Sequence, residues 1–544
     1  MTGLRMQWVS PKIFGGEMHV FSVLTVFVLC CSIPVRAAET VPSTVAATSW
    51  TSTLPVLPAE ALQRDIDTLE STYAALHPGL HRYLDDARLD AAYAKLRERF
   101  ANQVRLDQVF LAYSAFAAKI RCGHTYTNFF NQSEAVQKAL FEHPRLPFLF
   151  RWIDGEMVVT RDLGSGADLK PGTRIIALDE VRSRKLLAAL MPYARADGGN
   201  DHKRIAYLQR IGGTRYEAFD IYYPLLYPDT VADTVRIRFI APGERRARAA
   251  SIRKLPYSGE APPMEATAQA SPADSPLGWS MVYPRPDLAV MRMAGWEVFK
   301  YEDWDWQAFV DRAFADLATR DVRDLVIDLR GNEGGGNVGS ALLARLIDTP
   351  ATMAISTRSV RYRRVPDALR ANLSTWDKSF NDWGETAVGP ENGFYRLTKY
   401  DTDKTGIMIA PKAPRFAGRV WVVVGPDNSS ATYEFAQAIQ VGKLGTLVGE
   451  PTGGNQRGIN GGAFFFMTLP GSGIELDVPL IAQFPETPIP DAGLSPDLPA
   501  RASADSIAAY RDVALEAIFA RIDQNGPAQK HCKRKDFDDC RAGP

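Results

Sequence analysis

The segment that most constrains the fold runs from residue 279 to residue 523, where apolar strand patterns alternate with amphipathic helix patterns. The runs DLVIDLR and RVWVVVG are apolar over most of their length, as expected of strands buried on both faces of a parallel sheet. The run DWQAFVDRAFADLAT instead repeats apolar residues at helical spacing. Strands that alternate with helices predict a layered α/β core.

Two other patterns precede this core. Residues 58–144 predict a helical region, because runs such as AEALQRDIDTLESTYAAL repeat apolar residues every three to four positions. Residues 145–257 predict a small β-rich domain, in which LPFLFRWIDGEMVVTRDL forms two strands with a turn at Asp154 and Gly155. Residues 258–278 are rich in Ala, Pro and Ser and predict a linker between this domain and the core.

The N-terminus carries the pattern of an export signal. The apolar run VFSVLTVFVLCCSI is too short to span a bilayer comfortably, and the small residues of VRAAET follow it. We therefore expect residues 1–38 to be a signal peptide, with the signal itself near residues 18–38. The protein is then expected to be exported, either to the periplasm or out of the cell. The alternative is an anchor formed by an uncleaved N-terminal helix. Residues 39–57, rich in Thr, Ser, Ala and Pro, predict a linker, and residues 524–544 predict a solvated tail.

Composition excludes several classes of function. Lys and Arg together number 63, as do Asp and Glu, so the chain lacks the basic excess of a nucleic-acid-binding protein. No HExxH motif is present, and the cysteines that follow the signal, Cys122, Cys532 and Cys540, do not make a zinc site. Cys532 and Cys540 could form a disulfide in an oxidising compartment, which leaves Cys122 free. We expect no metal, no other cofactor and no membrane span after signal removal.

Two loops follow buried strands of the predicted core. The first is GNEGGGN at residues 331–337, whose glycines let backbone N–H groups approach a negative charge. The second is DNSSATYEF, which places Ser430 between a strand and a helix, beside helix-terminal N–H groups. Each loop alone has an ordinary structural explanation: a tight turn for the first, and a helix cap by Ser429 or Ser430 for the second.

The order and spacing of five motifs resemble those of the C-terminal-processing, or tail-specific, serine peptidases. The motifs are RCGHTYTNFF, DLRGNEGGGN, DNSSAT, GEPTGGNQ and GLSPDLP. The resemblance implies a ClpP/crotonase-like layered β/α catalytic core across residues 279–523, and a hydrolase that acts on peptide or protein substrates. In residues 145–257, the run ADLKPGTRIIALDEV is also similar to part of a PDZ domain.

The family resemblance assigns the catalytic roles. Ser430 is the expected nucleophile, and His124 of the GHT motif is the expected general base, as in the histidine-based branch of the family that includes the tricorn core protease. A histidine with a pKa near 6.5 suits that role at neutral pH. The other branch uses a lysine, and Asn455 stands at its position. Because an amide cannot take a proton from a serine, this residue argues against a Ser–Lys dyad.

The resemblance also indicates the groups that support this pair. An acidic residue before the closing Gly-x-x-Pro-Asp pattern should orient the histidine, which points to Asp491 in preference to Glu486. The N–H of Ala431 and that of Gly334 or Gly335 are the expected oxyanion-hole donors.

Two other functions stay open alongside the peptidase. A protein of the same fold could bind lipids or peptides without cleaving them. A crotonase-type acyl-CoA enzyme would share the layered core and the glycine loop, but export argues against it because CoA is cytoplasmic.

Overall fold

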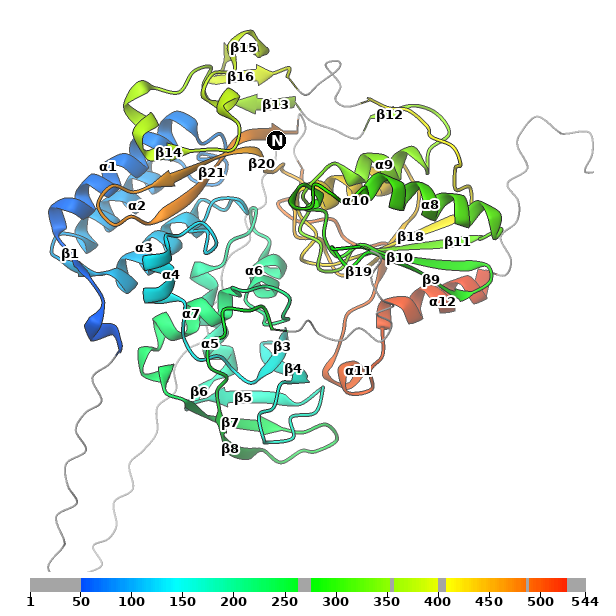
Figure 1. Ribbon diagram of the computed structural model, residues 1–544, viewed down its shortest axis with the longest axis horizontal. Helices are drawn as coiled ribbons and strands as arrows, with labels where there is room; N and C mark the ends of the chain where they lie inside the picture. The colour runs from blue at the N-terminus through cyan, green and yellow to red at the C-terminus, as the bar shows by residue number, and fades with distance from the viewer. Residues whose placement is uncertain (1–49, 263–274, 353–356, 400–407, 486–488, 526–544) are drawn as a thin grey trace, which may run out of the picture. The chain divides into compact units, whose positions relative to one another are not determined.

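The computed structural model describes residues 50–262, 275–352, 357–399, 408–485 and 489–525 (Figure 1). The predicted signal peptide, most of the predicted linkers, and the cysteines Cys532 and Cys540 lie outside these ranges. Cys122 is buried and free. In the described ranges, we find no helix that is both long and apolar enough to cross a membrane.

A largely parallel sheet of six strands, in the order β22-β19-β18-β11-β10-β9, forms the core of the C-terminal half. Only β9 runs antiparallel to its neighbour. The strands are β9 Ser280–Arg285, β10 Leu288–Arg292, β11 Asp324–Asp328, β18 Arg419–Val424, β19 Thr446–Gly449 and β22 Leu498–Pro499.

Helices cover both faces of this sheet. On β11, Leu325 and Ile327 pack in one apolar cluster with helices α8 (Trp306–Thr319), α9 (Val338–Ala344) and α10 (Ser430–Val441). Val326, which points to the opposite face because side chains alternate along a strand, packs with helix α12 instead. Helix α12 spans Val513–Asn525 and is preceded by the short α11, Ala504–Ala508. The predicted layered α/β core is therefore confirmed, and α12 extends two residues into the predicted tail.

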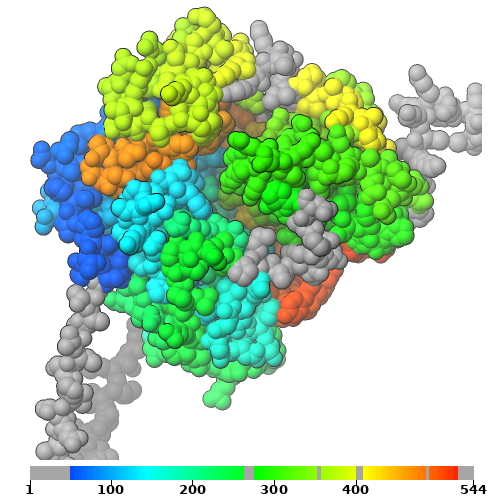
Figure 2. Space-filling view, viewed as in Figure 1, coloured from blue at the N-terminus to red at the C-terminus, as the bar shows by residue number. Residues whose placement is uncertain are grey.

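A second, antiparallel sheet has the order β14-β20-β21-β13-β16-β15. Its strands are β13 Thr357–Val360, β14 Leu373–Ser374, β15 Ala387–Glu391, β16 Phe394–Leu397, β20 Asn460–Thr468 and β21 Glu475–Phe484. In Figure 2 the yellow-green surface of residues 357–397 adjoins the orange surface of β20 and β21. The sequence predicts β20 and β21 as strands within the layered core. In the structure they belong to this second sheet and not to the parallel one. The alternation of buried and less buried residues along β20 fits a sheet with one covered face.

The N-terminal half provides helices and a third sheet. The helical region contains α1 Ala59–Leu76, α2 Asp86–Arg99, α3 Leu106–Lys119 and α4 Glu134–Leu140, as predicted. Before it, the end of the predicted linker is ordered, because Trp50–Thr53 forms a 3-10 helix and β1 (Val56–Leu57) pairs with β2 (Val104–Arg105).

The predicted β-rich domain is an antiparallel sheet in the order β3-β4-β5-β7-β8. Asp154 and Gly155 both have positive φ, 51° and 77°, which matches a tight hairpin between β3 and β4. The elements are β3 Phe148–Ile153, β4 Glu156–Asp162, β5 Arg174–Leu178, β6 Val181–Arg182, α5 Ser183–Leu190, α6 Asp201–Tyr207, α7 Ala218–Leu226, β7 Thr234–Ile240 and β8 Arg248–Arg253.

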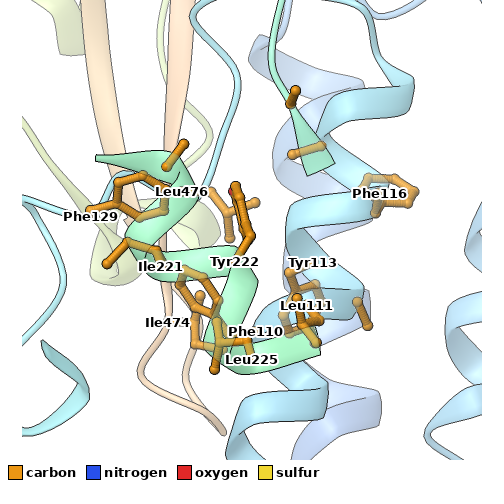
Figure 3. Close-up of a cluster of buried hydrophobic side chains, with 14 of the residues drawn as sticks. Phe110, Leu111, Tyr113, Phe116, Phe129, Ile221, Tyr222, Leu225, Ile474 and Leu476 are labelled. Atoms are coloured by element: carbon orange, nitrogen blue, oxygen red, sulfur yellow. The ribbon is translucent and has the colours of Figure 1, made fainter. Parts of the chain in front are cut away.

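One apolar core joins these N-terminal elements to the second sheet. Figure 3 shows Phe110 of α3, Tyr222 of α7 and Leu476 of β21 in a single cluster of buried side chains. Segments far apart in the sequence therefore fold together, and this cluster fixes the loop that follows α3, which carries the GHT motif.

Candidate active site

Ser430 lies where strand β18 gives way to helix α10. Its backbone has φ of 50°, a left-handed conformation that costs a non-glycine residue free energy and is concentrated at functional sites. Ser429, at the N-cap position, makes no capping hydrogen bond, and its Oγ donates to the carbonyl of Glu333 at 3.2 Å. The simple capping explanation therefore does not account for this pair of serines.

The glycine loop after β11 lies directly against Ser430. A Cβ placed on Gly334 would lie 2.9 Å from both the Cβ of Ser430 and the backbone nitrogen of Ala431. Gly334 also has φ of 105°, so only glycine fits there without strain. The carboxyl ends of β11 and β18 are neighbours in the parallel sheet, which explains why these two loops meet.

Three polar side chains lock the two loops together. Asn428 donates from Nδ2 to the carbonyls of Leu329 (2.6 Å) and Asn332 (3.0 Å). Thr432 donates to the carbonyl of Asn332 at 3.0 Å, and Asn332 donates from Nδ2 to the carbonyl of Met293 at 2.8 Å. All three side chains are buried, so this network holds the serine and the glycine loop in one register.

The predicted oxyanion donors differ in their hydrogen bonding. The N–H of Gly334 donates to Oδ1 of Asn332 at 2.9 Å. Among the described residues, no hydrogen bond is donated by the N–H of Gly335 or of Ala431. Ala431 lies in the first turn of α10, where backbone N–H groups have no partner within the helix. Gly335 and Ala431 are thus the pair with N–H groups available to an oxyanion.

His124 lies in the loop that follows helix α3, against the second sheet. Its ring centroid is 5.6 Å from that of Phe464, and a Cβ on Gly461 would lie 3.5 Å from its Cε1. Burial lowers the pKa of His124, and the negative charge of Asp197 opposes that change. Its Nδ1 is buried without a hydrogen-bond partner among the described residues, and within them no hydrogen bond joins His124 to Ser430.

An ionic group of Arg195, Lys203 and the half-exposed Glu333 connects the histidine loop to the glycine loop. Arg195 donates from Nη1 to the carbonyl of Gly123 at 2.6 Å and from Nη2 to the carboxylate of Glu333 at 2.8 Å. Its guanidinium also lies 4.4 Å from the ring centroid of Tyr126. Lys203 donates to the second oxygen of Glu333 at 2.5 Å.

This ionic group fixes the charge of Glu333. Burial alone would raise its pKa, but the positive charges of Lys203 and Arg195 outweigh burial and hold the pKa far below its usual range. Glu333 adjoins Gly334, and Gly123 adjoins His124. The contacts therefore place the expected base and the expected nucleophile on loops that one carboxylate and one guanidinium connect.

The acidic residues near His124 are only partly those that the sequence indicates. Asp491 accepts hydrogen bonds from Nδ2 of Asn455 at 2.7 Å and from the N–H of Gly199 at 2.9 Å. Glu486 lies outside the described residues. Asp197, which the sequence does not single out, accepts the N–H of Gly123 at 2.8 Å and is 2% exposed.

Asp197 was not identified from the sequence because it belongs to no recognised motif and lies in a loop of the predicted β-rich domain. Asn455, at the position of the lysine in the other branch, is fully buried and also donates to the carbonyl of Asp197 at 3.2 Å. It therefore ties the loops of Asp197 and Asp491 together, a structural role that suits an amide.

A second histidine supports the same loop. The Nε2 of His77 lies 2.7 Å from Oγ1 of Thr125, and its Nδ1 accepts the N–H of Gly79 at 3.1 Å. Burial lowers the pKa of His77 to about 3, so the ring is neutral. Among the residues that the structure describes, no cluster of His, Cys, Asp or Glu side chains could hold a metal ion.

The parallel sheet, the glycine loop and the serine at the start of α10 define a serine-type hydrolase. Residues 287–498 match the model of peptidase family S41, which identifies this part of the chain as a peptidase domain of that family and the protein as a serine-type peptidase. No protein in the curated set matches it.

Solved structures agree at the level of the fold. Mature CPAF in complex with lactacystin is similar with a TM-score of 0.58 and 14% identity, over 85% of this chain and 98% of that one. A serine-to-alanine mutant of CPAF gives a TM-score of 0.58 and 14% identity, over 87% and 99% of the two chains. The photosystem II D1 C-terminal processing protease, at 16% identity over 81% and 92%, has a TM-score of only 0.36.

Proposed function

We propose that this peptidase cleaves peptide bonds through an acyl-enzyme on Ser430, with His124 as the general base. The observation that carries the proposal is the position of Ser430: it has φ of 50° at the end of a buried strand and packs against Gly334. The connection from Glu333 through Arg195 to the carbonyl of Gly123 supports His124 as its partner.

The chemistry follows from these positions. His124 takes the proton of the Ser430 hydroxyl, and the serine oxygen attacks the substrate carbonyl carbon. The N–H groups of Ala431 and Gly335 donate to the oxyanion, and loss of one such donor typically costs about 3 kcal/mol of barrier. His124 then protonates the leaving amine, and a water, activated by His124, releases the acyl group. Hydrogen bonds of this kind are often long in a free enzyme and tighten with substrate.

The lowered pKa of His124 suits this role. Because burial disfavours the imidazolium, the ring stays neutral at physiological pH and can accept a proton. Among the charges that raise the pKa of His124, that of Asp197 has the largest effect, so it compensates the imidazolium when it forms, and Asp197 holds the histidine loop through the N–H of Gly123. We therefore propose Asp197 as the supporting acid, with Asp491 as a residue that positions its loop. Glu486 stays a prediction from the sequence.

A fluorophosphonate probe tests the nucleophile, because it labels only an activated serine. We expect the wild type to be labelled and Ser430→Ala to be unlabelled. Ser429→Ala is the matched control, since it removes the neighbouring hydroxyl and one hydrogen bond to Glu333, and it should keep most of the labelling. Lactacystin, with which mature CPAF forms a complex, can be tested as a second ligand of the wild type and of Ser430→Ala.

Three results would contradict the proposal. A wild-type protein that takes no label, yet binds peptides or lipids, would be a binding protein on this fold. Unchanged activity in His124→Gln combined with loss in Asn455→Ala would place the base elsewhere. Binding of a CoA ester at the glycine loop would instead favour the crotonase-type alternative.

We also propose that the enzyme is exported. The support is the apolar run at residues 20–33 with the small residues that follow it. N-terminal sequencing of the protein from a cell envelope fraction should find a new terminus near Ala37 or Ala38. An intact N-terminus in the membrane fraction would indicate the uncleaved anchor.

A further inference from the structure

An exposed tryptophan stands close to the candidate active site. Trp376 lies in the loop after strand β14, and 61% of it is exposed. Three other aromatic rings nevertheless hold it: those of Phe380, Phe466 and Phe464, whose centroids lie 5.6, 5.7 and 5.8 Å from its own. A large apolar side chain that is fixed in position but left open to solvent is typical of a binding surface.

The register of β20 explains why two of these rings are available. Ala463, Phe465 and Met467 point into the apolar core and are buried, whereas Phe464 and Phe466 alternate with them and are only partly buried. The two partly buried phenylalanines therefore lie on the opposite face of the second sheet, where Trp376 contacts both.

This surface is continuous with the expected general base. The ring of Phe464 contacts Trp376 on one side and lies 5.6 Å from the ring of His124 on the other. The apolar surface of Trp376, Phe464 and Phe466, which we call the aromatic shelf, thus begins next to the group that transfers the proton. A bound substrate must place its scissile bond within hydrogen-bond reach of that histidine.

The shelf is large enough to contact more than one side chain of an extended peptide. Side chains on one face of an extended chain recur every two residues, about 7 Å apart. The centroids of Phe464 and Trp376 are 5.8 Å apart, less than that repeat, so the two packed rings form one continuous apolar surface that two alternate side chains can share. Aromatic rings contribute large contact areas with little loss of conformational entropy, which makes them effective anchors for apolar groups.

We propose that the aromatic shelf is a substrate subsite that binds large apolar side chains on alternate residues of an extended peptide, close to the scissile bond. The inference rests on the proposed function, because it takes His124 as the base. It commits to the substrate peptide as the occupant, since the shelf is continuous with that residue.

The test uses the full-length enzyme and a set of fluorogenic peptides in which each position near the scissile bond carries Phe, Leu or Ala. We expect the wild type to favour Phe or Leu over Ala at one position or two alternate positions by about tenfold or more in kcat/KM. Trp376→Ala and Phe466→Ala should reduce that ratio to within about threefold, mainly through KM. The control is Tyr510→Ala, which removes a 73% exposed ring from the loop between α11 and α12 and should leave the ratio unchanged.

Three outcomes separate the possibilities. An unchanged Phe-to-Ala ratio in both shelf variants, with normal melting temperatures, would overturn the shelf while leaving the peptidase intact. Loss of a dimer in Trp376→Ala by analytical ultracentrifugation, with peptide preference unaltered, would overturn it in favour of a contact between two copies of the chain. A wild type that neither cuts peptides nor takes the fluorophosphonate label would instead refute the proposed function.

Discussion

The two halves of the candidate active site are assembled in different ways. The serine half consists of two loops that leave adjacent strands, β11 and β18, at the same edge of one parallel sheet. The histidine half draws His124 from the loop after α3, Arg195 and Lys203 from the segment after α5, and Phe464 from the second sheet.

The difference shows what each half depends on. Sheet geometry brings the loops of the serine half together, since parallel neighbours end at one edge, and short-range hydrogen bonds of Asn428 and Thr432 then hold them. The histidine half depends on long-range packing and on the ionic contact of Arg195 and Lys203 with Glu333. We therefore expect substitutions that alter the local backbone or introduce steric clashes to inactivate the serine half. In the histidine half, we expect activity to be lost through changes in charge and in contacts between distant residues.

The largest effect should come from the two residues that must act together across the halves. Ser430→Ala and His124→Gln should each lower kcat by about 10⁴-fold or more, and the double variant should be no worse than either single variant. This non-additivity arises because neither group acts without the other. Single-turnover cleavage of a fluorogenic peptide measures it. Effects that multiply would show that the two halves act independently.

Gly334→Ala should be the next most damaging, because the added methyl would lie 2.9 Å from both Cβ of Ser430 and the nitrogen of Ala431. We expect kcat to fall by about 10²-fold to 10³-fold, as for a lost oxyanion donor. Gly331→Ala is the matched control. Gly331 also has a positive φ, 81°, so an alanine there is strained as well, but its added Cβ would meet only one atom, at 4.0 Å. Equal losses in the two variants would mean that strain, and not the space beside Ser430, matters.

Charge changes in the ionic group should have smaller effects with opposite pH signatures. Glu333 raises and Arg195 lowers the pKa of His124, and the proposed mechanism requires the neutral form of this histidine. Glu333→Gln should therefore move the acidic limb of kcat/KM to lower pH, and Arg195→Met should move it to higher pH. Each should cost about 10-fold to 100-fold at the optimum, because a buried charge loses its partner.

Arg64→Met, which removes an arginine that is 59% exposed on α1, is the control for this pair. The pH dependence of kcat/KM and the melting temperature should be measured for all three variants. If both ionic variants shift the limb in the same direction, the group supports folding only and does not tune the base.

The smallest effect concerns stability at the edge of the histidine half. The carboxylate of Asp477 on β21 accepts hydrogen bonds from Asn128 and Asn131, in the segment that follows His124. Burial raises the pKa of Asp477 to about 7, although those two hydrogen bonds oppose the rise. Between the unfolded value near 4 and this folded value, the native state binds more protons, so its stability should fall as pH rises.

Asp477→Asn should remove most of that dependence between about pH 4 and pH 7, measured by urea unfolding. Asp168→Asn, at an acid that is 81% exposed, should leave the slope as it is in the wild type. A slope that Asp477→Asn does not alter would mean that other acids cause the pH dependence.

Much of the fold could be predicted because it depends on local sequence patterns. The apolar runs of β11 and β18, the helical spacing of α1 and α8, and the turn at Asp154 and Gly155 all appear in the structure as expected. Strands β20 and β21 are strands as predicted, but the sequence does not indicate that they join a separate antiparallel sheet, because alternation reveals that one face is buried and not which sheet a strand joins.

The candidate site divides in the same way. Ser430, His124, Gly334, Gly335 and Ala431 were found from short motifs, as were Asp491 and Glu486. Asp197, Arg195 and Lys203 were not, because no motif marks them and their partners are distant in sequence: Gly123 is 74 positions from Asp197, and Glu333 is 130 positions from Lys203.

The sequence by itself determined the layered α/β core and the position of the serine between a strand and a helix. It also showed that Asn455 stands where the other branch of the family has a lysine. These depend on periodicity and on the chemistry of single side chains. Only the tertiary structure shows that Asp197 holds the loop of His124, that the N–H of Gly334 is already hydrogen-bonded, and that Phe464 lies against His124. Those features depend on contacts between residues far apart in the chain, which apolar packing and buried charge pairs specify only when the whole molecule is folded.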